Sequence, residues 1–338
     1  MRIAVCRPQV PFVYGGAEIV ADQLVAELRV RGHEAEIVSV PYAWEGASVL
    51  DHALVWRLLD LTGSPGKPID LAIATKFPSY GLRHANKVVW LLHQFRQAYD
   101  FDRTEYGQFS ESPLDRATRL AVERFDRVAF GEARRIFAIS GNVAGRLERF
   151  SGFGAEVLPH PPQDLDYRNA ASEGFVLSVN RLDRYKRIDL LIEAAKADPG
   201  LRAVIVGEGP DRGRLEQLAS GLDGQIEFTG RIEPDRLADL YSRCLAVYYA
   251  PVDEDFGMVP YEAFLSGKPV VTTVDSGGPL EIVHDGQTGL VVQPDAAALA
   301  GACSYLLGDP DRARAFGVAG KALAERVTWD RCIDRLLS

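Results

Sequence analysis

The chain has 338 residues, which is too many for one ordinary hydrophobic core and about right for two domains. Hydrophobic residues make up 47% of the chain, and this composition excludes a disordered protein and a fibrous repeat. The net charge of −9 at pH 7 argues against nucleic acid as the main partner.

Cysteine and histidine usage gives no sign of a disulfide framework or a metal site. The four cysteines contain no C-x-x-C pair, and the six histidines show no metal-ligand spacing. The N-terminal M-R-I-A-V-C is typical of a first strand rather than a signal peptide, and no apolar run reaches the ~18 residues of a membrane span. We therefore expect a cytoplasmic protein with reduced thiols and no transmembrane segment, and peripheral contact with the inner face of the membrane stays open.

The first part of the chain alternates short apolar runs with amphipathic segments. In chain order, the expected strands are 2–6, 35–40, 70–77, 87–93 and 135–140, and the expected helices are 16–31, 49–61 and 112–133. Gly32 stands where a helix C-terminal glycine is expected, and Ser140 where an N-cap is expected. This βαβ order indicates a parallel sheet with helices on both faces.

The alternation pauses at residues 159–174, where P-H-P-P and a polar run predict a linker. It then resumes with expected strands at 175–180, 201–207, 225–229, 244–250, 270–274 and 288–292. We therefore expect two doubly wound α/β domains, residues 1–165 and 166–320. Ligands in such sheets bind at the carboxyl ends of the strands, where the candidate motifs fall.

The most informative segment is A-P-V-D-E-D-F-G-M-V-P-Y-E-A-F-L-S-G-K-P at residues 250–269. Its Phe256-Gly257 turn predicts the start of a helix. The first N–H groups of that helix, those of Met258 and Val259, would then point at the ligand. Because a helix N-terminus favours anions, a phosphate group is the expected ligand there.

Two carboxylates flank this turn in an E-x7-E pattern. Glu262 lies about one turn into the helix, where it would accept hydrogen bonds from both ribose hydroxyls. Glu254 lies in the loop before the turn and would reach a sugar ring. Two alternatives stay open: both glutamates are solvated surface acids, or Asp253 and Asp255 bind a divalent metal.

The run R-L-D-R-Y-K-R follows the strand at 175–180 and supplies fixed cations. Arg181 offers a planar fork for phosphate oxygens, and Lys186 offers a compact charge. Together they would stabilise a departing diphosphate without a metal. Arg184 and Arg187 are expected to face solvent, and an inert surface cluster is the alternative for the whole run.

Three other strand ends carry weaker signals. Gly207 and Gly209 form a G-x-G turn that a tight structural turn explains fully. Gly16 opens a helix where backbone amides would approach a phosphate or sugar, and a plain helix entry explains it equally well. His93 ends a strand, and its imidazole or carbonyl would accept a hydrogen bond from a sugar hydroxyl, although a structural role is the stronger expectation.

The acceptor side has only positional signals. The segment 49–61, with Trp56 and several leucines, would suit a lipid-linked acceptor, but core packing is the stronger interpretation. Lys76 and Arg83 follow another strand and would contact the acceptor.

Taken together, these residues resemble the family-4 retaining glycosyltransferases, which belong to the glycosyl transferases group 1. The resemblance covers nearly the whole chain and implies the GT-B fold, in which two doubly wound Rossmann-like domains face each other across a cleft. The motifs that carry it are G-G-A-E (15–18), G-H-E (32–34), S-V-N-R-L-D-R-Y-K-R (178–187), V-G-E-G-P (206–210), F-T-G (228–230), the E-x7-E segment and G-G-P-L-E-I-V…G-Q-T-G-L-V-V (277–292). L-H-Q-F-R-Q around His93 and P-H-P-P at 159–162 depart from the commoner family patterns.

The resemblance implies a role for each donor-side residue. Arg181 and Lys186 would contact the donor diphosphate, with Glu262 on the ribose and Glu254 on the donor sugar. Further donor contacts would come from the Phe256-Gly257 turn, the amides of Met258 and Val259, and, near the base, Arg231 and Ile232.

In the first domain, Gly16 would approach the donor phosphate, and His93 would lie near the reacting centre. Residues 1–165 would form the acceptor side and 166–320 the donor side. Residues 321–338, which include Trp329-Asp330, would form a helix that crosses back to the first domain.

The implied activity is transfer of a sugar from a nucleotide-diphosphate sugar to a hydroxyl acceptor, with retention of configuration and with no metal or cofactor (EC 2.4). Alternatives are a phosphorylase or sugar epimerase of the same architecture and a non-catalytic nucleotide-sugar-binding protein. A Rossmann dehydrogenase is less favoured, because no G-x-G-x-x-G follows the first strand.

Overall fold

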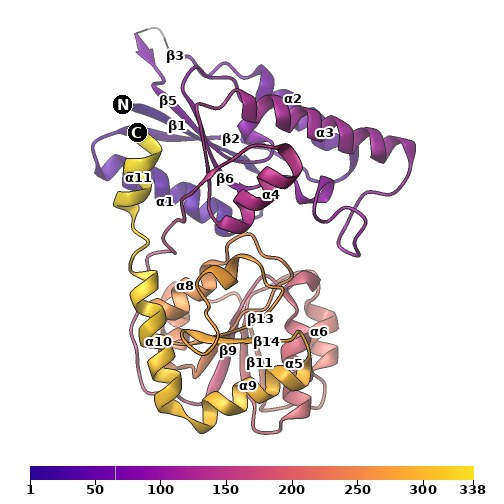
Figure 1. Ribbon diagram of the computed structural model, residues 1–338, viewed down its shortest axis with the longest axis vertical. Coiled ribbons are helices and arrows are strands. Elements are labelled where there is room, and N and C mark those ends of the chain that lie inside the picture. The colour runs from indigo at the N-terminus through magenta and orange to yellow at the C-terminus, as the bar shows by residue number, and fades with distance from the viewer. Residues whose placement is uncertain (65) are drawn as a thin grey trace. The chain divides into compact units, whose positions relative to one another are not determined.

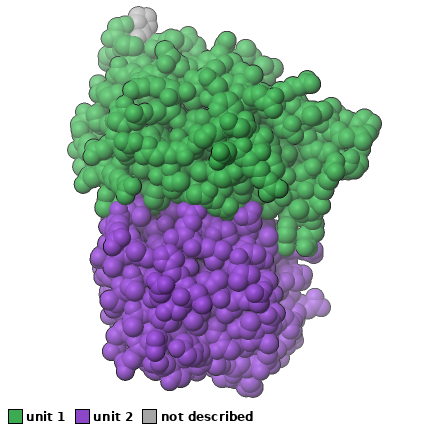
Figure 2. Space-filling model, viewed as in Figure 1, with its two compact units in different colours: residues 1–160, 328–338 green, residues 161–327 purple. Residues whose placement is uncertain are grey.

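The computed structural model describes residues 1–64 and 66–338. Its contacts divide the chain into two compact units (Figure 2). Unit 1 comprises Met1–His160 and Thr328–Ser338, and unit 2 comprises Pro161–Val327. Each unit contains a six-stranded parallel sheet with helices packed against it (Figure 1). In the described part of the chain, no helix is long and apolar enough to cross a membrane.

Unit 1 has the strand order β2-β1-β5-β6-β7-β8. Its elements in chain order are β1 (Arg2–Gln9), α1 (Gly16–Val30), β2 (Glu34–Pro41), η1 (Gly46–Ser48), α2 (Val49–Leu58), β3 (Gly63–Ser64), β4 (Lys67–Pro68), β5 (Leu71–Lys76), η2 (Ser79–Gly81), β6 (Lys87–His93), η3 (Arg96–Ala98), α3 (Pro113–Gly131), β7 (Arg135–Ala138), α4 (Gly141–Ser151), β8 (Glu156–Val157) and α11 (Trp329–Leu337). The order reverses between β1 and β5, so that the carboxyl ends of these two strands form the switch point of the sheet. The last helix, α11, contacts α1 (Figure 1).

Unit 2 has the strand order β11-β10-β9-β12-β13-β14. Its elements are β9 (Phe175–Val179), η4 (Arg184–Lys186), α5 (Ile188–Ala197), β10 (Arg202–Val206), α6 (Arg212–Leu218), β11 (Ile226–Gly230), α7 (Pro234–Arg243), β12 (Ala246–Tyr248), α8 (Met258–Leu265), β13 (Val270–Thr273), η5 (Gly278–Glu281), β14 (Gly289–Val292), α9 (Ala296–Gly308) and α10 (Pro310–Ala324). Here the order reverses between β9 and β12. The run that carries Arg181 follows β9, and the E-x7-E segment follows β12, so both candidate motifs flank the switch point.

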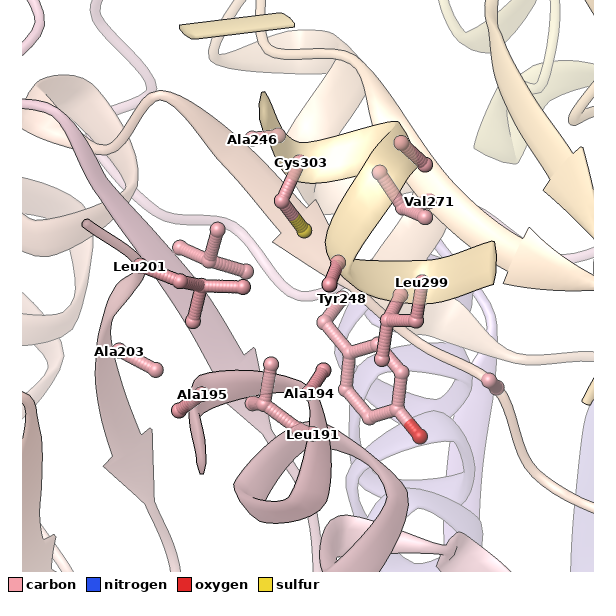
Figure 3. Packing of buried hydrophobic residues seen from close by; sticks show 14 of the residues in the cluster. Leu191, Ala194, Ala195, Leu201, Ala203, Ala246, Tyr248, Val271, Leu299 and Cys303 are labelled. Atoms are coloured by element: carbon pink, nitrogen blue, oxygen red, sulfur yellow. The ribbon is translucent and has the colours of Figure 1, made fainter. Parts of the chain in front are cut away.

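Small side chains let the helices of unit 2 lie close to its sheet. Ala194 and Ala195 of α5 pack with Ala203 of β10, and Leu299 and Cys303 of α9 belong to the same buried cluster (Figure 3). Helix α5 contacts α9, so one face of the sheet has a continuous apolar cover. This core fixes the strand ends from which the candidate site is built.

Helix α8, which begins at the predicted turn, packs against α10. Two glycines of α10 make the approach possible. A Cβ on Gly317 would lie 2.0 Å from the carbonyl oxygen of Gly267, and one on Gly320 would lie 2.2 Å from the ring of Phe264. The position of α8 therefore depends on glycines far along the chain from the site.

Candidate active site

The loop after β9 is anchored through its backbone to the loop after β10. Leu182 is fully buried, its N–H donates to the carbonyl of Glu208 at 3.0 Å, and its own carbonyl accepts from the N–H of Asp211 at 3.0 Å. Arg181 stands beside this anchor with a side chain 48% exposed, and it pairs with Asp183 at 3.2 Å. The loop therefore holds its backbone firmly and presents a guanidinium at the carboxyl end of the sheet.

The two glycines of V-G-E-G-P allow this close approach. A Cβ on Gly207 would lie 1.9 Å from the carbonyl oxygen of Asn180, and one on Gly209 would lie 2.4 Å from that of Leu182. Gly207 also has a φ of +126°, which L side chains rarely adopt. The interpretation of this motif as a tight structural turn is confirmed.

Lys186 and Glu254, predicted separately from distant motifs, form an ion pair. The hydroxyl of Tyr249 lies 3.1 Å from Glu254 Oε2, to which it donates, and 3.4 Å from Lys186 Nζ. The side chains of Lys186 and Glu254 are only 13% and 14% exposed. Burial first, and then Glu254, raise the pKa of Tyr249, so the phenol stays protonated and acts as a donor. The site thus has a lysine and a carboxylate held together by one tyrosine.

The E-x7-E segment turns into α8 at Gly257, as the sequence predicts. Gly257 is the N-cap residue with a φ of +81°, and a Cβ there would lie 2.8 Å from Tyr249 Cε1. Phe256 stacks on the ring of Tyr261 with centroids 4.7 Å apart. The helix then begins at Met258, and the N–H groups of its first turn have no carbonyl partner within the helix. This end of α8 has the charge character that an anion needs.

The second carboxylate, Glu262, is buried inside unit 2 and only 3% exposed. Its Oε2 accepts a 2.6 Å hydrogen bond from the Tyr241 hydroxyl. Burial raises the pKa of Glu262, and hydrogen bonds from Tyr241 and Gln163 oppose that rise. Part of the hydrogen-bonding capacity of this carboxylate is therefore used by the fold, and its role toward a ribose stays a prediction.

Arg231 and Ile232 follow β11, the outermost strand of the sheet. Gly230, just before them, accepts from the N–H of Gly207 at 2.9 Å, which joins this loop to the one after β10. Arg231 is exposed, and Ile232 is half-buried. Both residues lie at the carboxyl edge that also carries the ion pair.

The expectation that Arg187 faces solvent is wrong. Its side chain is only 14% exposed and pairs with Asp275 at 2.9 Å. Its carbonyl accepts from the Tyr248 hydroxyl at 2.6 Å, and its φ is +52°. Arg187 ties the loop after β9 to the loop after β13, a long-range role that a local basic run does not reveal. Arg184 is exposed, as expected.

Tyr249 and Asp275 are two residues of this region that sequence reasoning missed. A signal existed for Tyr249, since it directly follows a buried strand and therefore places its hydroxyl-bearing side chain at the carboxyl edge of the sheet. No local signal marks Asp275, because its partner is set by the sheet topology.

Unit 1 brings its own candidates to one edge of its sheet. Gly16 opens α1, and the Gly15 N–H donates to Glu18 Oε2 at 3.0 Å. Glu18 also pairs with Lys76 at 3.0 Å, so Lys76 has an internal partner. Lys76 is the register partner of His93 across β5 and β6. All these residues therefore lie at the carboxyl ends of the central strands of this unit.

The His93 ring lies with Nδ1 2.7 Å from the carbonyl oxygen of Gln94. A carbonyl only accepts, so Nδ1 carries a proton. The role of His93 toward a sugar hydroxyl stays a prediction.

Helix α2 supports the core-packing interpretation for Trp56, which is fully buried. Leu54 and Leu58 of the same helix are 57% and 70% exposed. Arg83 donates to the carbonyl of Arg57 at 3.1 Å, near the end of α2. Across the described residues, no group of three or more His, Cys, Asp or Glu side chains is arranged to hold a metal ion.

Residues 166–323 match the family model described as Glycosyl transferases group 1. Most of unit 2 is therefore similar to the glycosyl transferases group 1. The more specific placement in family 4 stays a prediction.

Relatives of this chain include the D-inositol 3-phosphate glycosyltransferase of Nocardia farcinica, which is 33% identical over 61% of this chain and 49% of its own length. The protein of that name from Rhodococcus erythropolis is 26% identical over 96% of this chain and 85% of its own length. The human alpha-1,3/1,6-mannosyltransferase ALG2 is 30% identical over 48% of this chain and 43% of its own length. The chain thus spans about half the length of several curated relatives that it matches.

Solved structures extend the likeness to both units. Sucrose-phosphate synthase from Thermosynechococcus elongatus has a TM-score of 0.77 at 19% identity, covering 99% of this chain and 97% of its own. Anabaena HepE, solved with UDP and glucose, has a TM-score of 0.72 at 17% identity, covering 100% and 98%. At these identities the likeness shows the fold alone, and it confirms the predicted GT-B fold with two Rossmann-like domains.

Proposed function

We propose that this chain transfers a sugar from a nucleotide-diphosphate sugar to a hydroxyl acceptor, with retention of configuration and without a metal or cofactor. The observation that carries the proposal is the Lys186–Glu254–Tyr249 cluster beside the start of α8, at the switch point of a domain similar to the glycosyl transferases group 1. The likeness to HepE, which was solved with UDP-glucose, supports a nucleoside diphosphate as the leaving group.

In the proposed reaction, the bond between the anomeric carbon and the diphosphate oxygen breaks, and its electron pair stays on the diphosphate. Lys186 turns from Glu254 toward the growing negative charge, and Arg181 and the first N–H groups of α8 share that charge. Glu254 then accepts a hydrogen bond from a hydroxyl of the donor sugar. The contacts of Lys186, Arg181 and the start of α8 with the diphosphate strengthen as its negative charge grows in the transition state, and this is what accelerates the step.

The acceptor hydroxyl then bonds to the anomeric carbon from the face that the diphosphate leaves. Its proton passes to the departing diphosphate oxygen, so no protein base is needed. Attack from that same face retains the configuration. We assign to the His93 imidazole a hydrogen bond with a sugar hydroxyl, which holds the sugar ring during the exchange.

The test is a panel of nucleoside-diphosphate sugars incubated with the full chain and simple glycosides, with and without chelator. We expect one donor to raise the melting temperature and to release nucleoside diphosphate together with a glycoside product, at a rate that chelator leaves unchanged. Phosphate-dependent cleavage without a nucleotide would instead identify a phosphorylase, and interconversion of two donor sugars an epimerase. Tight donor binding with no turnover on any acceptor would favour a binding protein.

A further inference from the structure

Unit 1 contains a buried carboxylate that the proposed reaction does not use. Asp126 of α3 is fully buried. Its Oδ1 accepts from the Tyr80 hydroxyl at 2.8 Å, and its Oδ2 accepts from the Tyr99 hydroxyl at 2.8 Å. In the described chain, no lysine or arginine lies within ion-pair distance of Asp126, so neutral donors alone satisfy it.

The third donor connects this carboxylate to the candidate site. The Gln94 side chain is buried, and its Nε2 lies 3.5 Å from Asp126 Oδ2 and 2.8 Å from Ser151 Oγ. The carbonyl of the same Gln94 is the group that accepts from His93 Nδ1 at 2.7 Å. Gln94 therefore holds the His93 ring through its backbone while Asp126 and Ser151 hold its side chain.

Tyr99 fixes the other end of the same loop. It is the C-cap residue of η3, the short helix that follows Gln94, and it is only 8% exposed. Because Asp126 accepts from both Gln94 and Tyr99, one carboxylate fastens the loop immediately after His93 at two points. Tyr80, from the loop after β5, brings a third segment to that carboxylate.

We propose that Asp126 is a positioning residue for His93: by holding the loop 94–99, it keeps the Gln94 carbonyl aimed at Nδ1 and so fixes the orientation and the tautomer of the ring. This inference rests on the proposed function for the group that the ring acts on, a sugar hydroxyl. A metal-ligating or catalytic histidine is commonly oriented by a hydrogen bond to its second nitrogen, and here the orienting carbonyl is itself supported by a buried acid.

The charge state of Asp126 agrees with a supporting role. Burial raises its pKa to about 7, while the hydrogen bonds from Tyr80, Tyr99 and Gln94 oppose that rise. Glu123, on the same helix, is the acid that adds to the rise from its own element. A carboxylate this deeply buried is retained at a cost, which its three donors only partly offset.

The experiment is a double-mutant cycle in the full-length protein with Asp126→Asn and His93→Ala. If Asp126 acts through His93, Asp126→Asn lowers kcat by on the order of tenfold in the wild-type background and has no further effect once His93 is alanine. Affinity for the nucleoside diphosphate, which unit 2 residues carry, stays within twofold. Multiplying effects of the two substitutions would overturn the proposal, because a general loss of stability acts equally in both backgrounds.

A second readout does not depend on turnover. Nitrogen-15 NMR of the histidine rings reports which ring nitrogen of His93 carries the proton. We expect the Nδ1-protonated form in the wild type and a mixture of both forms in Asp126→Asn, whereas Glu123→Gln, on the same helix, leaves the signal unchanged. An unchanged His93 signal in Asp126→Asn would overturn the proposal even if the protein transfers no sugar.

If Asp126→Asn does not fold, the milder Tyr99→Phe variant can be tested in its place. It removes one donor to Asp126 and keeps the ring. We expect a smaller shift of the His93 signal in the same direction, and no shift at all would also overturn the proposal.

Discussion

Lys186→Met isolates the charge that the proposed mechanism needs most. Methionine keeps an apolar stem of similar length and removes the ammonium group. Glu254, only 14% exposed, then loses its ion-pair partner. Removing one partner of a fully buried pair costs roughly 3–5 kcal/mol, so we expect a loss of about 2 kcal/mol in unfolding free energy at this partly exposed site.

The loss of turnover should exceed the loss of stability. A single preorganised donor to a developing oxyanion contributes on the order of a hundredfold to a thousandfold in kcat. Because Arg181 and the start of α8 remain, we expect the lower end, about a hundredfold, or ~2.7 kcal/mol of transition-state stabilisation. The assay is steady-state release of nucleoside diphosphate, with urea unfolding measured on the same samples.

Two further variants separate the effects. Lys196→Met removes an exposed lysine that pairs with Glu193 at 2.9 Å on the surface, and it should change neither quantity by a measurable amount. Lys186→Met with Glu254→Gln should regain most of the stability, because the partly buried negative charge at position 254 is removed together with the lysine. Turnover within twofold of wild type in folded Lys186→Met would refute the assigned role of the charge.

Three other perturbations test neighbouring parts of the account. Tyr249→Phe removes the hydroxyl that donates to Glu254 and should lower kcat about tenfold, since a hydrogen bond to a charged group contributes ~1.5–3 kcal/mol. The exposed Tyr305→Phe is its control, and equal kinetics in both variants would contradict a catalytic contribution from the Tyr249 hydroxyl. Gly257→Ala should destabilise the protein by ~1–2 kcal/mol and weaken nucleoside-diphosphate binding, because the φ of Gly257 is +81° and the new Cβ would lie 2.8 Å from the Tyr249 ring. Its control is Gly213→Ala, where the new Cβ has no neighbour within 4 Å, and this variant should be neutral or stabilising. For Asp126, the pKa of about 7 lies above its unfolded value of roughly 3.9, so the folded state binds more protons between those values and stability falls as pH rises through that window. Between pH 5 and 7.5, the free energy of unfolding measured with urea should fall by about 2–3 kcal/mol more in the wild type than in Asp126→Asn. Equal pH slopes in the two proteins would contradict this.

Much of the architecture follows from local pattern. Apolar runs located every strand of both six-stranded sheets except the two-residue β8, and glycine at 257 marked the start of α8. The boundaries are less accurate for a physical reason. Residues 244–250 are all buried, yet regular strand pairing covers only Ala246–Tyr248, because an apolar run reports burial and not the regular pairing that defines a strand. Conversely, β1 continues through the half-buried Arg7 and Gln9, because eight residues pair with β2.

The site was predictable where one segment contains its own signal. Arg181, Lys186 and Glu254 each stand in a recognisable motif after a strand. What holds them is not local: Lys186 meets Glu254 only because β9 and β12 are neighbours, and Arg187 meets Asp275 for a similar reason. Side-chain partners set by strand order cannot be found from a single sequence without the fold.

The most direct test of the central claim is calorimetric titration of the full chain with UDP, GDP and ADP, repeated with Lys186→Met. We expect one nucleoside diphosphate to bind with one site per chain, and the variant to bind it at least tenfold more weakly, ~1.4 kcal/mol or more. Equal affinity in both proteins, or no binding of any of the three, would contradict a diphosphate site formed by Lys186 and the start of α8.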